Sequence, residues 1–228
     1  MTPPPEPMAL ARLKSDRLLA VIRAASPASA IASARAVAAG GIALLEVTYT
    51  VPDASTAIAE LARDAALVVG AGTVLTAAQA HAAIGAGARF IVAPNLSAEV
   101  AAIAKRAGMM FCPGAYTTGE ILAARAAGAD VVKVYPVGVA GGPAYITVIR
   151  DPLPDVPMLA AGGTNLDNVV PFLRAGCLGC GLGGALADPA LAAAGDFAEI
   201  TRRAAAFVAT VRAAEASGEI PVRAAALP

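Results

Sequence analysis

Short runs of apolar and β-branched residues alternate along the chain with longer, alanine-rich stretches. The runs are LLAVIRA (18–24), ALLEVTY (43–49), ALVVGAG (66–72), RFIVAP (89–94), MMFCPG (109–114), DVVKVYP (130–136), PMLAAGG (157–163) and CLGCGLG (177–183). Apolar runs of this length, bounded by turn residues, are typical of strands that are buried on both faces. The pattern therefore predicts eight strands.

The stretches between the runs carry the signals of helix ends. SPASAIASARAVAAG (26–40) and TTGEILAARAAGA (117–129), for example, open with serine or threonine and close at glycine, which are common residues at helix starts and ends. We expect these stretches to be crossover helices, and the last long stretch, ITRRAAAFVATVRAAEASG (200–218), to be a closing helix.

Eight strand–helix units in 228 residues favour an α/β fold of the (β/α)8 or TIM-barrel type, in which a ring of helices covers a parallel barrel. A doubly wound open sheet is the alternative. The stretch LLAVIRAASP after the first strand lacks the G-x-G-x-x-G of a dinucleotide-binding fold. We expect one domain over residues 1–228, with a short N-terminal helix and frayed tails at 1–7 and 219–228.

Composition narrows the class of function. The formal net charge is zero, so no basic surface is expected to recruit nucleic acid or a membrane, and the apolar stretches are too short to span a bilayer. The prolines of MTPPPEP oppose a secretory signal. These features favour a cytoplasmic protein that acts on a small molecule.

Three cysteines cannot all pair with one another, which agrees with a reducing compartment. Cys177 and Cys180 have the C-x-x-C spacing, but the chain has one histidine, His81, and no second C-x-x-C. A zinc site would therefore have too few ligands. We interpret the pair as part of a buried strand and expect neither a metal nor a cofactor.

Lys133 is the most informative polar residue, because it alone of three lysines lies within an apolar run. Alternation puts Val131, Lys133 and Tyr135 on one face of a strand, which in a barrel is the inner face. A buried ammonium group is unfavourable unless it is paired or loses its proton, and a neutral amine attacks ketones to form an imine. The alternative is a structural ion pair with a carboxylate such as Glu46.

Glu46 lies in LLEVT, where Leu44, Glu46 and Thr48 share a face. Burial raises the pKa of a carboxyl group, which suits a group that takes and returns a proton near neutral pH. Lys133 and Glu46 are therefore the predicted catalytic residues, and with an iminium as electron sink they need no metal.

Other candidates also follow strands, where barrel enzymes place their active sites. The glycine pairs Gly162-Gly163 and Gly183-Gly184 lie at the ends of the last two runs and are typical of phosphate sites, although glycines there are also ordinary turn residues. Arg23 lies at the end of the first run and would bind a carboxylate or phosphate, or else lie in solvent.

Together the motifs resemble the family of 2-keto-3-deoxy-6-phosphogluconate (KDPG) and 2-keto-4-hydroxyglutarate (KHG) aldolases. They are AVIRA, LEVTYTVPDA, VGAGTVL, FIVAPN, PGAYT, VVKVYP, GGP, AAGGTNLDNV and AGCLGCGLGGAL, in family order over roughly residues 18–212. The resemblance implies a class I aldolase of sugar-acid metabolism of the Entner–Doudoroff type, commonly a homotrimer, that splits KDPG or its galactonate epimer into pyruvate and glyceraldehyde 3-phosphate.

The resemblance also assigns residue roles. It implies that Lys133 forms the Schiff base and that Glu46 is the general acid and base. The implied substrate-binding residues are Arg23, Thr73 and Pro94 at the pyruvyl end, Tyr135 where an aromatic residue is usual, and Gly162, Gly163 and Gly184 near the distal phosphate.

Two positions depart from the family. Ala161 replaces a threonine that would contact the hydroxyl groups of the sugar acid, and Gly184 replaces a serine that often binds phosphate. These departures leave open a pyruvate aldolase for another aldehyde: glyoxylate from 4-hydroxy-2-oxoglutarate, or an unphosphorylated sugar aldehyde. The remaining alternatives are a phosphate-binding isomerase or epimerase, whose metal-dependent types need more ligands than this chain offers, and a non-catalytic barrel.

Overall fold

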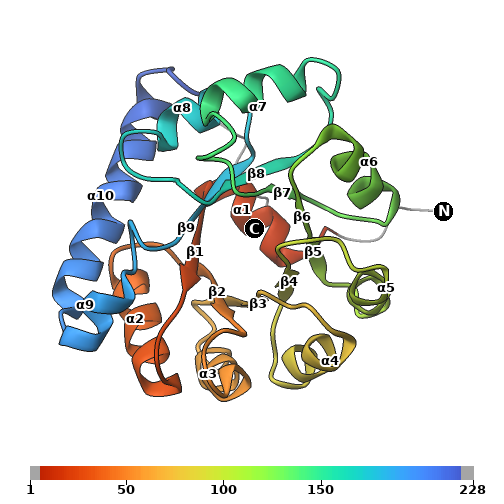
Figure 1. The fold of residues 1–228 in the computed structure, drawn as a ribbon. Coiled ribbons are helices and arrows are strands. Elements are labelled where there is room, and N and C mark those ends of the chain that lie inside the picture. The colour runs from red at the N-terminus through yellow and green to blue at the C-terminus, as the bar shows by residue number, and fades with distance from the viewer. Residues whose placement is uncertain (1–5, 222–228) are drawn as a thin grey trace.

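The computed structural model describes residues 6–221, and its elements follow the predicted alternation (Figure 1). The strands are β1 (Leu18–Ile22), β2 (Leu44–Thr48), β3 (Val68–Gly72), β4 (Phe90–Val92), β5 (Met110–Cys112), β6 (Gly114–Ala115), β7 (Val132–Val134), β8 (Met158–Ala161) and β9 (Gly179–Leu182). The helices are α1 (Met8–Asp16), α2 (Pro27–Ala39), α3 (Ala54–Leu61), α4 (Ala77–Gly85), α5 (Ala98–Arg106), α6 (Thr118–Ala126), α7 (Pro143–Arg150), α8 (Val169–Arg174), α9 (Pro189–Ala194) and α10 (Phe197–Ala216).

These strands form one parallel sheet in the order β5-β4-β3-β2-β1-β9-β8-β7-β6. The two strands at its ends, β5 and β6, are consecutive in the chain and are separated only by Pro113. The amide of Lys133 donates to the carbonyl of Pro113 at 2.9 Å, and the register of β7 on β6 continues from there. The sheet therefore closes on itself, and the predicted (β/α)8 barrel is confirmed.

One predicted strand differs in detail. The run 109–114 is two short strands, because Pro113 has no amide hydrogen and interrupts the ladder. A side chain at Gly114 would also place its Cβ 2.1 Å from the carbonyl oxygen of Pro94. Glycine there allows the two backbones to approach closely enough for the barrel to close.

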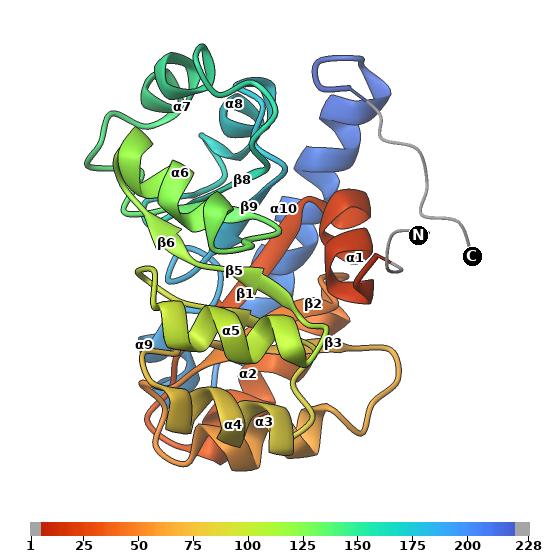
Figure 2. The same cartoon turned by 90° about the vertical axis from the view of Figure 1, so that its right-hand side faces the viewer.

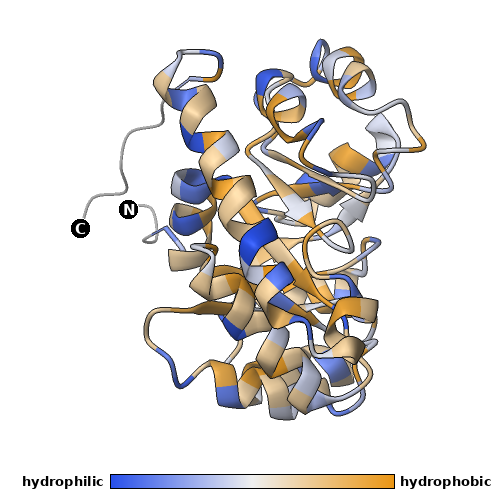
Figure 3. Ribbon diagram, turned by 90° about the vertical axis from the view of Figure 1, so that its left-hand side faces the viewer, coloured by the Kyte–Doolittle hydropathy of each residue, from blue (hydrophilic) through white to orange (hydrophobic). Residues whose placement is uncertain are grey.

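Apolar side chains fill two regions, one inside the barrel and one between the strands and the helices. Figure 3 shows that hydrophobic residues predominate along the strands. The inner cluster includes Leu19, Leu44 and Leu159 from the strands and Leu13 from α1. Leu13 packs where Gly179 begins β9, because a Cβ on that glycine would lie 2.7 Å from the Leu13 Cδ1 atom. Helix α1 thus covers the N-terminal end of the barrel (Figure 2) and leaves the opposite end open.

The C-terminal segment continues beyond α10 against the body of the protein. Ile220 is buried in the outer cluster, and the carbonyl of Pro221 accepts a hydrogen bond from the buried Arg17 guanidinium. Glu219 forms an ion pair with Arg174. Residues 219–221, which we expected to be frayed, are therefore packed, whereas residues 1–5 and 222–228 of the expected tails lie outside the described residues. Across residues 6–221, no helix combines the length and the apolar character needed to cross a bilayer.

Candidate active site

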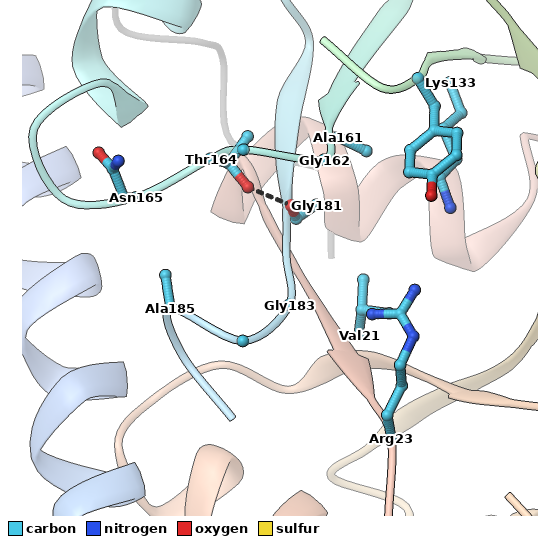
Figure 4. Close-up of a pocket in the computed structure, with 13 residues that line it drawn as sticks. Val21, Arg23, Lys133, Ala161, Gly162, Thr164, Asn165, Gly181, Gly183 and Ala185 are labelled. Atoms are coloured by element: carbon cyan, nitrogen blue, oxygen red, sulfur yellow. Dashed lines mark hydrogen bonds between the residues drawn. The ribbon is translucent and has the colours of Figure 1, made fainter. Parts of the chain in front are cut away.

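A cavity of about 510 Å³ opens at the C-terminal ends of β1, β7, β8 and β9 (Figure 4). Its lining residues come from four strand ends and the loops that follow them: Val21, Arg23, Lys133, Tyr135, Ala161, Gly162, Gly163, Thr164, Asn165, Gly181, Gly183, Gly184 and Ala185. This is the end of the barrel where enzymes of this fold place their chemistry.

Lys133 lies in the middle of β7 with its side chain directed into the barrel, as alternation with Val131 in the inner cluster predicts. The residue is only 5% exposed. Its Nζ atom lies 5.2 Å from the centre of the Tyr135 ring, within the range of a cation–π contact. The amine is thus enclosed but reaches the cavity, as an imine-forming lysine requires.

Glu46 reaches Lys133 from β2; it is completely buried and is not among the lining residues of the cavity. The nearest charge is Lys133, whose Nζ atom lies 4.0 Å from Oε1, which is longer than the roughly 2.7–2.9 Å of a charge-assisted hydrogen bond. Neither carboxylate oxygen has a hydrogen-bond partner among the described residues. Buried polar groups are usually satisfied, so this geometry does not resemble a structural ion pair.

Burial raises the pKa of Glu46, because removal from water penalises the charged form more than Lys133 and Arg23 favour it. A carboxyl group in this state exchanges protons closer to neutral pH than an ordinary glutamate. Lys133 and Glu46 together provide an amine and a proton acceptor in one enclosed volume.

Arg23 follows β1 and extends toward the opening, with Lys133 across the cavity from it (Figure 4). Its guanidinium passes close to the β9 loop, where a Cβ on Gly183 would lie 3.2 Å from the Nη1 atom. A positively charged group at the mouth favours an anionic ligand.

The loop after β8 is held open by glycines and hydrogen bonds. Gly162 and Gly163 have positive φ values of 78° and 105°, which side chains disfavour. A Cβ on Gly162 would also lie 2.9 Å from the Tyr135 ring. The Asn168 side chain donates to the Gly163 carbonyl at 2.8 Å, which fixes the loop beside Gly184 in the cavity lining.

Two predicted substrate-binding residues, Pro94 and Thr73, are not among the lining residues of the main cavity. Pro94 lines a neighbouring cavity of about 290 Å³, which shares Tyr135 with the main one. Thr73 follows β3 with a positive φ of 55° and is among the lining residues of neither cavity. The lining of the main cavity thus includes Lys133, Arg23, Tyr135 and the three predicted glycines, and it does not include Pro94 or Thr73.

Sequence reasoning missed several lining residues, chiefly Thr164 and Asn165. The Thr164 hydroxyl donates to the Gly181 carbonyl at 2.5 Å (Figure 4), so it ties the two glycine loops together. The sequence could have indicated Thr164 and Asn165, because they directly follow Gly162-Gly163. Nothing in the sequence indicated Val21, Gly181 and Ala185, because apolar and small residues at these positions look the same as residues of the hydrophobic core.

None of the three cysteines is among the lining residues of the main cavity. Cys180 lies in β9, as expected, and Cys177 is buried just before it. Cys112 faces the barrel interior, and burial raises the pKa of its thiol to about 12. Among residues 6–221, no three His, Cys, Asp or Glu side chains come together as metal ligands.

Comparison with known proteins places this geometry in context. A family model described as "KDPG and KHG aldolase" matches residues 10–203. The chain is 38% identical over 202 residues to the 2-dehydro-3-deoxy-6-phosphogalactonate aldolase of Escherichia coli K12, covering 86% of this chain and 95% of that one.

Solved structures agree with the sequence comparison. The KDPG aldolase of Legionella pneumophila, with pyruvate captured as a covalent carbinolamine, superposes with a TM-score of 0.80 at 27% identity, over 88% of this chain and 98% of that one. A protein cage designed by fusing symmetric oligomeric domains gives a TM-score of 0.81 at 34% identity, over 89% of this chain and 74% of the other.

Proposed function

Because the chain belongs to the KDPG and KHG aldolase family, it is a carbon–carbon lyase, and we propose that it works through an imine on Lys133. It is a class I aldolase that reversibly cleaves KDPG, or its galactonate epimer, to pyruvate and glyceraldehyde 3-phosphate. The observation that carries the assignment of residues is the enclosed pair of Lys133 and Glu46, with 4.0 Å between Nζ and Oε1.

In the proposed mechanism the Lys133 amine attacks C2 of the substrate, and loss of water from the carbinolamine gives an iminium. Glu46 then accepts the proton of the C4 hydroxyl group as the C3–C4 bond breaks. The bonding electrons move into the iminium to form an enamine, and the aldehyde leaves. Proton return from Glu46 to C3 and addition of water then release pyruvate and the free lysine.

We assign the substrate's anionic groups to the cations and amides of the cavity. Arg23 binds the carboxylate or the phosphate, and Tyr135 packs beside the imine. Gly162, Gly163 and Gly184 supply backbone amides for a distal phosphate, in the position that this fold commonly uses. We also assign Thr73, after β3, and Pro94, after β4, to the pyruvyl end of the substrate.

A second candidate substrate is an unphosphorylated aldehyde or glyoxylate. It is favoured by Ala161 and Gly184, which line the cavity without a hydroxyl group, and by Thr164, whose hydroxyl is already bonded to Gly181. Comparing kcat/KM for glyceraldehyde 3-phosphate, glyceraldehyde and glyoxylate as acceptors distinguishes the candidates. The phosphorylated substrate predicts a preference for glyceraldehyde 3-phosphate.

We also propose that residues 1–228 form a single domain, that the protein assembles as a homotrimer, and that it acts in the cytoplasm. The likeness to a cage built from symmetric oligomeric domains supports assembly. The three cysteines, which are free and buried, suit a reducing compartment.

The imine is tested by incubating the protein with pyruvate and borohydride and locating the reduced adduct by mass spectrometry. We expect the adduct on Lys133 and on neither Lys14 nor Lys105. Lys133→Arg keeps a positive charge but should give no adduct and no cleavage, whereas the surface control Lys105→Arg should behave as wild type. A folded wild-type protein that traps no pyruvate would contradict the mechanism.

A further inference from the structure

The inner face of β3 carries almost no side chains near the active site. Alternation places Val68, Gly70 and Gly72 on this face, since Val68 belongs to the inner cluster while its neighbours Val69 and Ala71 belong to the outer one. The two glycines lie opposite Glu46 and Thr48 in the register with β2. Two successive inner positions are therefore free for side chains from neighbouring strands.

Different groups fill the two spaces. A Cβ on Gly70 would lie 2.4 Å from the ring of Phe90, so that space holds part of the apolar core. A Cβ on Gly72 would lie 2.6 Å from Oε1 and 2.7 Å from Cδ of Glu46. The space beside Gly72 therefore holds the carboxylate that the mechanism uses.

We propose that Gly72 is a positioning residue for catalysis: its missing side chain lets the Glu46 carboxylate lie facing Lys133. This inference rests on the proposed roles of Lys133 and Glu46. A buried carboxylate is normally aimed by hydrogen-bond donors, but neither oxygen of Glu46 has such a partner among residues 6–221. Its place is set by the shape of the space and by the attraction of Lys133 at 4.0 Å.

Gly72→Ala separates this role from a structural one. Gly72 does not have a positive φ, so the strand backbone accepts alanine, and replacing glycine removes freedom from the unfolded chain. The atoms that the new Cβ meets are the end of a flexible side chain rather than backbone. We therefore expect the carboxylate to move while the fold persists.

The first measurement compares wild type, G72A and the control G119A, whose Cβ on α6 would meet nothing within 4 Å. We expect kcat for cleavage to fall at least about tenfold in G72A, since a positioned acid–base group contributes roughly 10²–10⁴-fold. The melting temperature of G72A should equal or exceed that of wild type, and G119A should keep wild-type kcat. Gly70→Ala should instead lower the melting temperature, because Phe90 is held in the core.

A double-variant cycle with Glu46→Gln then tests whether the effect passes through the carboxylate. Exchange of the methyl protons of pyruvate for deuterium, followed by NMR, gives a rate that remains measurable in slow variants. Gly72→Ala should slow exchange strongly in the wild-type background and little in the E46Q background. An equal factor in both backgrounds, a wild-type kcat in G72A, or a loss explained by unfolding alone would each overturn the proposal. If wild type still traps pyruvate on Lys133, such a result leaves the proposed function intact.

Discussion

At the scale of single residues, the proposed chemistry depends on two ionisable side chains in an otherwise apolar interior. The neighbours of Lys133 and Glu46 inside the barrel include Val92, Cys112 and Leu159. Placing a carboxylate there without hydrogen bonds opposes folding. Such an arrangement is expected where function rather than stability has selected the residue.

Glu46→Gln should lower kcat by about 10²–10⁴-fold and change the pH dependence of stability. The pKa of Glu46 in the folded protein is raised above its ordinary 4.5, so the folded state holds the proton more tightly than the unfolded chain. Wild-type stability from this group therefore falls as the pH rises from about 4.5 through the raised pKa. Glutamine cannot ionise, so the variant lacks this loss.

Urea unfolding of both proteins at a series of pH values checks the expectation. The free energy of unfolding of E46Q minus that of wild type should increase with pH across that window and then level off. A difference that does not vary with pH, or that decreases, would show that the fold does not raise the pKa of Glu46.

At the scale of elements, the two ends of the barrel have separate tasks. Helix α1 closes the N-terminal end, with Ala9 and Leu13 in the inner cluster, while the loops after β1, β7, β8 and β9 form the cavity at the other end. The interruption between β5 and β6 at Pro113 lies where the barrel closes, because β5 pairs with β4 and β6 pairs with β7. Stability and catalysis are therefore expected to respond to different substitutions.

Leu13→Ala should destabilise the protein by about 2–5 kcal/mol, because it leaves a cavity at a fully buried site, yet keep kcat near the wild-type value at low temperature. Met8→Ala in the same helix is the matched control, since Met8 is 63% exposed, and should change stability little. Denaturant unfolding with parallel assays of cleavage measures both. A large loss of kcat in a folded L13A protein would mean that α1 influences the active site.

At the scale of the whole molecule, the formal net charge is zero, so the charge that attracts an anionic substrate is local and comes from Arg23 and Lys133 at the cavity. Long-range steering by the protein as a whole is expected to contribute little. The specificity of the enzyme should depend on the loops at the strand ends.

The proposed homotrimer predicts a particle of three times the chain mass of 22.4 kDa in light scattering coupled to size exclusion. The mass should stay constant on dilution to the concentrations used for assays. A single-chain mass with full cleavage activity would exclude the trimer as the functional unit. A mass of two or four chains would contradict the trimer as well.

The sequence by itself determined the architecture and predicted the two residues that the proposed mechanism uses. Short, continuously apolar runs between alanine-rich helices indicate a barrel because parallel strands must be covered on both faces. Lys133 and Glu46 were recognisable because charged residues within apolar strands are rare. Arg23, Tyr135 and the glycines after β8 and β9 were found from their places at strand ends, a rule that depends only on chain order.

Only the tertiary structure decided the distances between side chains, the space beside Gly72, and which residues line which cavity. The sequence does not contain the 4.0 Å between Nζ of Lys133 and Oε1 of Glu46, because residues 87 positions apart meet only through closure of the barrel. It also could not place Pro94 in a neighbouring cavity or assign Thr164 to the main one. A residue's neighbours depend on strand register and on the path of the loops, neither of which can be read from the sequence. That the Glu46 side chain occupies the space beside Gly72 could therefore be learned only from the three-dimensional structure.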